Sequence, residues 1–237
     1  MNQEEMMQQL QAAVQAYQRK DLDGAEVVFK QILAVNPKEP NALHLLGCIN
    51  KDRGNLQQAI DLIQASIRED DSNPIPFLNL GKILSIAGQH ENAAGVFQES
   101  LKRNQQIPEA WFCFGNALRE MGKTQEAIQA YRNTLQRNHA HAGAAGNLGA
   151  LLTEEEKLDE AEEVLRKALE IAPENANCLV NLGHVLKDEG EVEEAIASYR
   201  KAIAEKPDFA DAYLSLGLVL KEEGEVEEAI ASYRKAI

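Results

Sequence analysis

The sequence predicts an all-α fold built from tandem helix–turn–helix repeats of 34 residues, and three observations support this prediction. The stretch 182–203 returns as 216–237, with two of its 22 positions changed. A glycine recurs every 34 residues, and so does an alanine that lies four residues before a large side chain. The glycines are Gly47, Gly81, Gly115, Gly149, Gly183 and Gly217, and the alanines are Ala25, Ala59, Ala93, Ala127, Ala161, Ala195 and Ala229. A fixed period of this length is typical of stacked repeat architectures.

Each repeat divides into two amphipathic helices. In the repeat 176–209, Leu179, Leu182 and Leu186 recur at helical spacing, which predicts a helix with one apolar face. Gly190 interrupts this pattern, which resumes until Pro207 ends the unit, because proline cannot continue a helix. The inner turn has glycine in most repeats, where a residue without Cβ adopts a positive φ at low cost.

The fifth repeat departs from this pattern. Glu156 stands where other repeats have the turn glycine, and Gly143, Gly146 and Gly149 all fall within its first helix. A glycine inside a helix costs about 1 kcal/mol relative to alanine. We therefore expect this helix to be the least stable of the array.

Composition limits the possible partners and the compartment. The chain has 237 residues, 44% of them hydrophobic, and a formal net charge of −14, which disfavours binding to nucleic acid. No apolar run is long enough for a transmembrane helix, and the N-terminus does not resemble a secretory signal. Cys48, Cys113 and Cys178 form no CxxC pair, so we expect free thiols in a reducing compartment, the cytoplasm.

The repeat resembles the tetratricopeptide repeat. Trp111, Phe114-Gly115, Leu118, Ala127 and Tyr131 carry the resemblance best. It covers the chain as seven units, about 6–39, 40–73, 74–107, 108–141, 142–175, 176–209 and a truncated 210–237. It implies one right-handed superhelical solenoid over 1–237, with first helices on the concave side. Arrays of this kind occur in bacterial, notably cyanobacterial, multidomain proteins, so the truncated last repeat suggests a fragment of a longer chain.

The resemblance also implies a peptide-binding groove with a polar row. The sixth position of the repeat holds Asn79, Asn147 and Asn181, and an asparagine offers a donor and an acceptor to a peptide backbone. This row is similar to the asparagine ladder in the repeat domain of O-linked N-acetylglucosamine transferase. Cys113 interrupts it. The alternative is that the asparagines are family consensus on a solvated face.

An apolar row lies beside the polar one. The fifth position holds Leu78, Phe112, Val180 and Leu214, which could anchor a partner or could pack inside the solenoid. At other groove positions we expect polar contacts from Lys82, Asn116 and His184. A clamp for chaperone C-termini is disfavoured, because the fifth position never holds lysine. A basic residue next to an acidic one, as in Lys51-Asp52, is expected to form an exposed ion pair that adds little stability.

Nothing in the sequence predicts catalysis, a metal or a cofactor. His139 and His141 fall in a turn between repeats, without nearby cysteines or an acidic cluster. His44 and His184 have no plausible nucleophile beside them in the sequence. The acidic run 154–163 is expected to be a solvated helix start favoured by the helix dipole.

We therefore expect a non-catalytic scaffold that binds an extended peptide or a flanking domain. One alternative is the substrate-recruiting arm of a larger enzyme, a glycosyl-, sulfo- or methyltransferase, that lies beyond Ile237. Another is self-assembly through the apolar end of the truncated repeat. If the asparagine row binds peptide, replacing Asn147 and Asn181 by alanine should weaken binding while the thermal midpoint barely moves.

Overall fold

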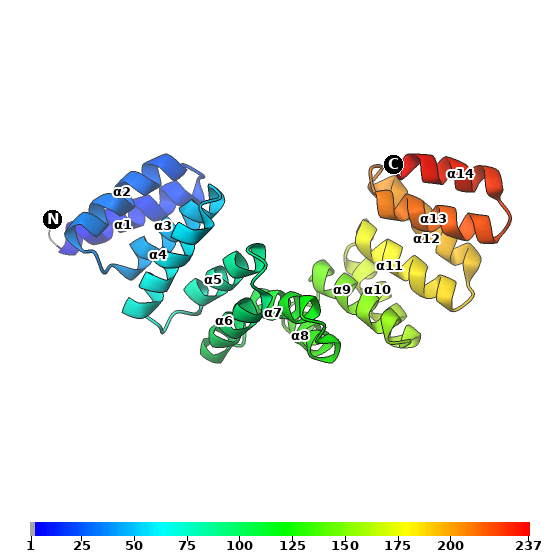
Figure 1. The fold of residues 1–237 in the computed structure, drawn as a ribbon, viewed down its shortest axis with the longest axis horizontal. Helices are drawn as coiled ribbons and strands as arrows, with labels where there is room; N and C mark the ends of the chain where they lie inside the picture. The colour runs from blue at the N-terminus through cyan, green and yellow to red at the C-terminus, as the bar shows by residue number, and fades with distance from the viewer. Residues whose placement is uncertain (1–2) are drawn as a thin grey trace. The chain divides into compact units, whose positions relative to one another are not determined.

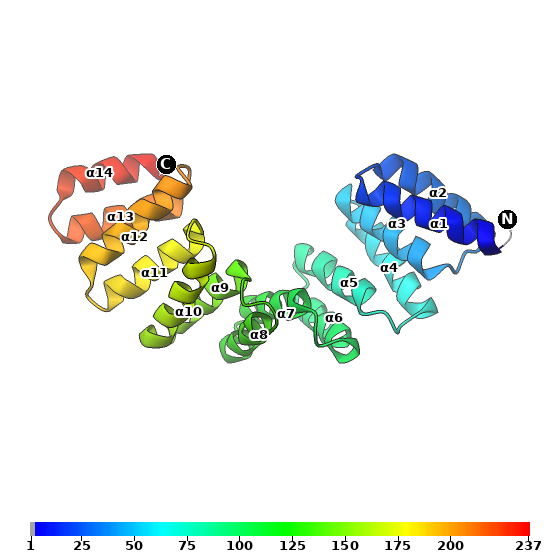
Figure 2. The same cartoon turned by 180° about the vertical axis from the view of Figure 1, so that it is seen from behind.

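The computed structural model describes residues 3–237, which form fourteen α-helices and no β-strand (Figures 1 and 2). The all-α prediction is confirmed. The helices are α1 (Gln3–Gln18), α2 (Leu22–Val35), α3 (Pro40–Asp52), α4 (Leu56–Glu69), α5 (Pro74–Ile86), α6 (His90–Arg103), α7 (Pro108–Glu120), α8 (Thr124–Arg137), α9 (Ala142–Glu154), α10 (Leu158–Ile171), α11 (Ala176–Asp188), α12 (Val192–Glu205), α13 (Ala210–Glu222) and α14 (Val226–Lys235).

The chain forms two compact units, residues 1–123 and 124–237. The first contains α1 to α7 and the second α8 to α14, so the boundary falls within the predicted fourth repeat. In both units the helices follow one another as antiparallel pairs, at the positions that the repeat period predicts (Figure 1). That all seven repeats form one domain over 1–237 stays a prediction.

The helix starts follow from local sequence. Pro40, Pro74 and Pro108 stand in the first turn of α3, α5 and α7, where a missing N–H breaks no hydrogen bond. Asn175 caps α11 by accepting a 2.9 Å hydrogen bond from the backbone N–H of Cys178. His141 caps α9 through Nδ1, which accepts from the N–H of Ala144 at 3.1 Å. His141 is therefore a capping residue.

The glycines and alanines that recur every 34 residues let the two helices of a repeat approach closely. All seven periodic alanines are at most 2% exposed. Gly183 lies against the ring of Tyr199 on the paired helix, and a Cβ added to the glycine would lie 2.5 Å from Tyr199 Cε1. The equivalent pairs are Gly47 with Ile63, Gly81 with Phe97, Gly149 with Leu165 and Gly217 with Tyr233. The repeated glycine and the large residue sixteen positions later thus form one interlocking contact.

The turn inside each repeat adopts a left-handed conformation. Gly54, Gly88, Gly122, Gly190 and Gly224 have φ between 71° and 85°. Lys20 and Glu156 occupy the equivalent places, with φ of 66° and 59°. Among residues 3–237 they are the two non-glycine residues with positive φ, a conformation that costs a side-chain-bearing residue about 1 kcal/mol or more.

Successive repeats stack mainly through the second helix of one repeat and the first helix of the next, such as α4 with α5 and α12 with α13, and their first helices also touch. In the first unit α5 contacts both α3 and α7, and in the second α11 contacts both α9 and α13. The second helices of the second unit are joined on their exposed side by a periodic ion pair, in which an arginine reaches a glutamate 28 residues later. The pairs are Arg132–Glu160 at 2.5 Å, Arg166–Glu194 at 3.3 Å and Arg200–Glu228 at 2.8 Å. Since these side chains are about half exposed, each pair adds little stability.

Candidate functional site

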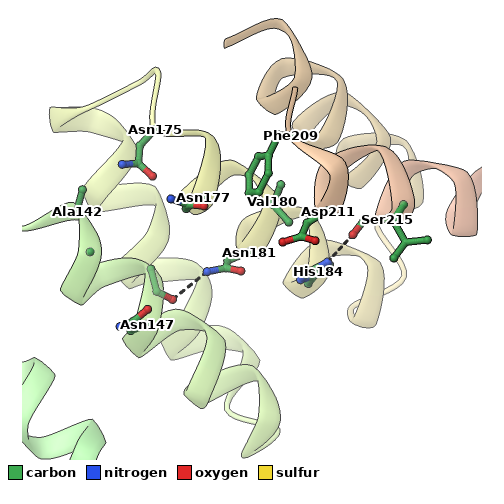
Figure 3. A pocket seen from close by; sticks show the side chains of 13 residues that line it. Ala142, Asn147, Asn175, Asn177, Val180, Asn181, His184, Phe209, Asp211 and Ser215 are labelled. Atoms are coloured by element: carbon green, nitrogen blue, oxygen red, sulfur yellow. Dashed lines mark hydrogen bonds between the residues drawn. The ribbon is translucent and has the colours of Figure 1, made fainter. Parts of the chain in front are cut away.

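Three successive first helices of the second unit line an open cavity of about 470 Å³ (Figure 3). Asn147 comes from α9, Val180, Asn181 and His184 from α11, and Leu214 from α13. These are five of the ten groove residues that the sequence predicts. The cavity combines amide groups with apolar side chains, a mixture typical of ligand-binding pockets.

Asn181 joins the floor of the cavity to the preceding repeat. Its Nδ2 donates a 2.9 Å hydrogen bond to the backbone oxygen of Gly146. The amide oxygen then turns toward the side of the cavity on which His184 and Asp211 lie (Figure 3). Asn147 likewise uses Nδ2, which lies 3.3 Å from the hydroxyl oxygen of Tyr131. The two predicted row residues therefore direct their amide donors into the repeat stack.

His184 links α11 to α13. Its Nε2 lies 2.9 Å from Oγ of Ser215, and its ring packs at a tilt against Tyr199, with centroids 5.6 Å apart. Burial lowers the pKa of His184, while the negative charges of Asp188 and Asp211 oppose that shift. The imidazole is therefore neutral at physiological pH. It can take part in hydrogen bonds without adding positive charge to the cavity.

A second cavity, of about 330 Å³, shares Asn181 and His184 with the first. Its other lining residues are Ala150, Thr153, Glu154, Lys187 and Asp188. The Lys187 ammonium lies 3.8 Å from the Glu222 carboxylate, so acids outnumber free bases here. The two cavities adjoin at the shared side chains of Asn181 and His184, and we call the surface of α9, α11 and α13 that lines them the first-helix groove.

The other five predicted residues lie on α5 and α7 of the first unit. Leu78 is buried, while Asn79, Lys82, Phe112 and Asn116 are half-buried. Lys82 forms a 2.7 Å ion pair with Glu109 of the next repeat. The apolar row is thus divided: Leu78 packs inside the stack, as the alternative interpretation expects, whereas Leu214 is exposed.

Asn79 belongs to a buried polar cluster. Its Nδ2 lies 2.8 Å from Nε2 of His44 and 3.5 Å from Sγ of Cys48. His44 is itself 3.5 Å from Cys48, so the structure corrects the sequence-based view that this histidine has no nucleophile beside it. Burial lowers the pKa of His44 to about 4 and raises that of the Cys48 thiol to about 11. Both groups are neutral at pH 7, the opposite of an activated thiolate–imidazolium pair.

Four polar and aromatic residues of the larger cavity of the first-helix groove were not predicted from the sequence: Asn175, Asn177, Phe209 and Asp211. Asn177 and Asp211 are the second residues of α11 and α13, so both lie in the first turn of their helices. Asn175 and Phe209 are the N-cap residues of α11 and α13. They precede the first helical residue, so a pattern of groove positions within the helix does not include them.

The described residues offer neither a metal centre nor a membrane span. No group of three histidine, cysteine or acidic side chains within residues 3–237 could hold a metal ion. Over the same range, none of the helices is both long and apolar enough to traverse a bilayer. The three cysteines are free thiols, with Cys48 and Cys178 buried.

The fold and the groove define a helical-hairpin repeat protein, and comparison with known families identifies which. The tetratricopeptide repeat profile matches residues 10–74 and 114–176, more than half of the chain. A second tetratricopeptide repeat profile matches 96–129, and a TPR repeat profile matches 183–224. The chain therefore belongs to the tetratricopeptide repeat family.

Solved structures share this fold at low sequence identity. A tetratricopeptide repeat protein from Parabacteroides merdae is 20% identical with a TM-score of 0.73, over 98% of this chain and 91% of that one. PilF of Pseudomonas aeruginosa is 19% identical with a TM-score of 0.70, over 81% and 88% of the two chains. YrrB, a TPR protein, is 23% identical with a TM-score of 0.60, over 74% and 90%. None of the curated proteins compared with this sequence matches it significantly.

Proposed function

We propose that this chain is a non-catalytic interaction scaffold that binds an extended peptide in the first-helix groove. The observation that supports this most is that the first helices of three successive repeats line the groove together, with both amide and apolar side chains. YrrB, which has the same fold, is described as having an unusual peptide-binding site. A protein or peptide partner, no nucleic acid and a cytoplasmic location form part of the same proposal.

Two histidines lie beside a potential nucleophile, His184 beside Ser215 and His44 beside Cys48. The surroundings of both pairs support a binding role and not a catalytic one. Ser215 lies in the middle of α13, where its backbone N–H and those of its neighbours are engaged in the helix. No pair of backbone donors can therefore stabilise an oxyanion beside its hydroxyl. In the first unit, His44 and Cys48 are buried in their neutral forms.

The test is a selection of random displayed peptides against the intact protein, followed by affinity measurements on variants. Leu214→Lys places a charge in the groove, while Ile171→Lys places the same charge on α10. These residues are matched in exposure, at 47% and 48%. We expect Leu214→Lys to weaken binding of the selected peptides at least tenfold and Ile171→Lys to leave it unchanged. Equal effects of the two variants would refute binding in the groove.

Self-association is a second candidate, supported by the exposed apolar surface of the last repeat. Leu218, Val226 and Ile230 are each between 45% and 55% exposed. A second copy could cover this surface. Sedimentation velocity tests it: a concentration-dependent dimer that Val226→Lys abolishes supports self-association, and a monomer at all concentrations removes it.

A further inference from the structure

We propose that the 470 Å³ cavity of α9, α11 and α13 binds the guanidinium group of an arginine in the bound peptide. This inference rests on the proposed function and names the anchoring side chain. It depends on the charge, the hydrogen-bonding groups and the aromatic ring that line the cavity.

The charge of the lining is negative. Asp211 is the one acidic side chain among the residues that line this cavity, and neither lysine nor arginine lines it. The Asp211 carboxylate, which faces the cavity in Figure 3, forms no ion pair with another side chain of residues 3–237. The adjoining cavity adds Glu154 and Asp188. An incoming cation would thus gain a partner without displacing one.

Asn181 presents an acceptor on the side of the cavity where Asp211 lies. One N–H of its Nδ2 donates to the Gly146 carbonyl, which orients the amide so that its oxygen points toward Asp211. A guanidinium group has five donors and no acceptor, so it complements an amide oxygen and a carboxylate placed side by side. A carboxylate ligand, by contrast, would meet like charge.

Phe209 supplies a flat surface at the same end of the cavity. Aromatic rings attract cations, and the Lys206 ammonium already lies over this ring, 4.6 Å from its centroid, so an incoming guanidinium would stack on the opposite face. A planar guanidinium can stack on a ring while its edge reaches a carboxylate, which a compact ammonium cannot do equally well. The combination of Phe209, Asp211 and Asn181 therefore favours arginine over lysine.

A small-molecule probe tests this without a peptide. N-acetyl-arginine methylamide and its uncharged citrulline analogue would be titrated into the ¹⁵N-labelled 237-residue protein. We expect the arginine compound to shift the backbone amides of Phe209, Asp211 and Asn181, and the citrulline compound to leave them in place. Asp211→Asn should abolish the shifts, Asp211→Glu should retain part of them, and Asp208→Asn, which changes a nearby acid outside the cavity, should retain them all.

The outcomes separate this inference from the proposed function. Equal shifts from both compounds, no shift from either, or shifts that survive Asp211→Asn would overturn the arginine pocket. If selected peptides still depend on Leu214 but lack arginine, the groove binds peptide and this inference is wrong. If peptides are indifferent to Leu214→Lys, the proposed function itself fails, whatever the probe shows.

Discussion

Asn181 donates its side-chain hydrogen bond to the backbone oxygen of Gly146, 35 residues earlier, and Asn79 reaches His44 over the same separation. In both cases the sixth residue of one repeat bonds to the fifth residue of the repeat before it. Where that fifth residue is glycine, the asparagine amide bonds to its backbone oxygen. Where it is histidine, the amide bonds to the imidazole Nε2 instead. Both asparagines therefore fasten neighbouring repeats together.

Asn181→Ala should consequently destabilise the protein. Removing the amide deletes a 2.9 Å hydrogen bond and leaves the Gly146 carbonyl without that donor, a loss of about 1 kcal/mol. This replaces the sequence-based expectation that the thermal midpoint barely moves. Urea denaturation followed by circular dichroism measures the change. Asn177→Ala is the control, because Asn177 is exposed and lines the same cavity; an equal loss in both variants would contradict the inter-repeat role.

Tyr131 and Tyr199 hold equivalent positions, yet their hydroxyl groups differ. The Tyr131 hydroxyl lies 3.3 Å from Nδ2 of Asn147, whereas the Tyr199 hydroxyl is buried with no hydrogen-bond partner among residues 3–237. The cause is the residue sixteen positions later, which is asparagine after Tyr131 and serine after Tyr199. Ser215 turns instead to His184, at 2.9 Å.

Replacing each tyrosine by phenylalanine should therefore have opposite effects. Tyr131→Phe loses a hydrogen bond and should cost about 1 kcal/mol, while Tyr199→Phe removes an unsatisfied buried hydroxyl and should be neutral or stabilising. Both side chains are fully buried, so the two substitutions are matched. Thermal and urea unfolding of the two variants measures these changes in stability. A larger loss of stability for Tyr199→Phe than for Tyr131→Phe would contradict the assignment of the hydrogen bond to Tyr131.

Glu156→Gly should stabilise the fifth repeat. Glu156 has φ of 59°, at the turn position where five other repeats have glycine, so glycine relieves a strain of about 1 kcal/mol. Lys20→Gly should act in the same way in the first repeat, where φ is 66°. The control is Glu155→Gly, since Glu155 has an ordinary φ of −87°, so glycine there relieves no strain, adds flexibility and removes the contacts of this carboxylate with Gln125 and Lys157. A gain in the control but not in Glu156→Gly, measured by urea denaturation, would refute this explanation.

The repeat period alone predicts most of the fold, because a strict 34-residue spacing dictates which residues meet. It places the glycine–aromatic contacts such as Gly183 with Tyr199, and it even singles out Glu156 as an anomaly at the turn. The groove is harder to predict, since its chemistry depends on side-chain direction. Asn181 was recognisable as a groove residue. Its hydrogen bond to the backbone of Gly146 was not, because it depends on the fifth residue of the preceding repeat being a glycine. Phe209 lies before its helix and enters the cavity only through the geometry of the turn.

His44 should make the stability of the first unit depend on pH. Its pKa is lowered by burial from 6.5 to about 4, so the unfolded chain binds a proton at a higher pH than the folded chain does. The stability contributed by the neutral, buried ring is therefore complete above pH 6.5 and is lost as the pH falls toward 4. Between pH 7 and pH 5 this loss should amount to about 2 kcal/mol.

His44→Leu isolates this effect from the carboxylates, which also titrate on acidification. Leucine or another non-titrating residue occupies the equivalent position in the other repeats, for example Leu78 and Val180, so the site accommodates an aliphatic side chain. At pH 7 the variant should be less stable, because Asn79 loses its 2.8 Å partner. Its stability should nevertheless fall less steeply than that of the wild type between pH 7 and pH 5. Urea midpoints measured in parallel at both pH values give the comparison, and identical pH slopes would show that the buried imidazole does not control the acid sensitivity of this unit.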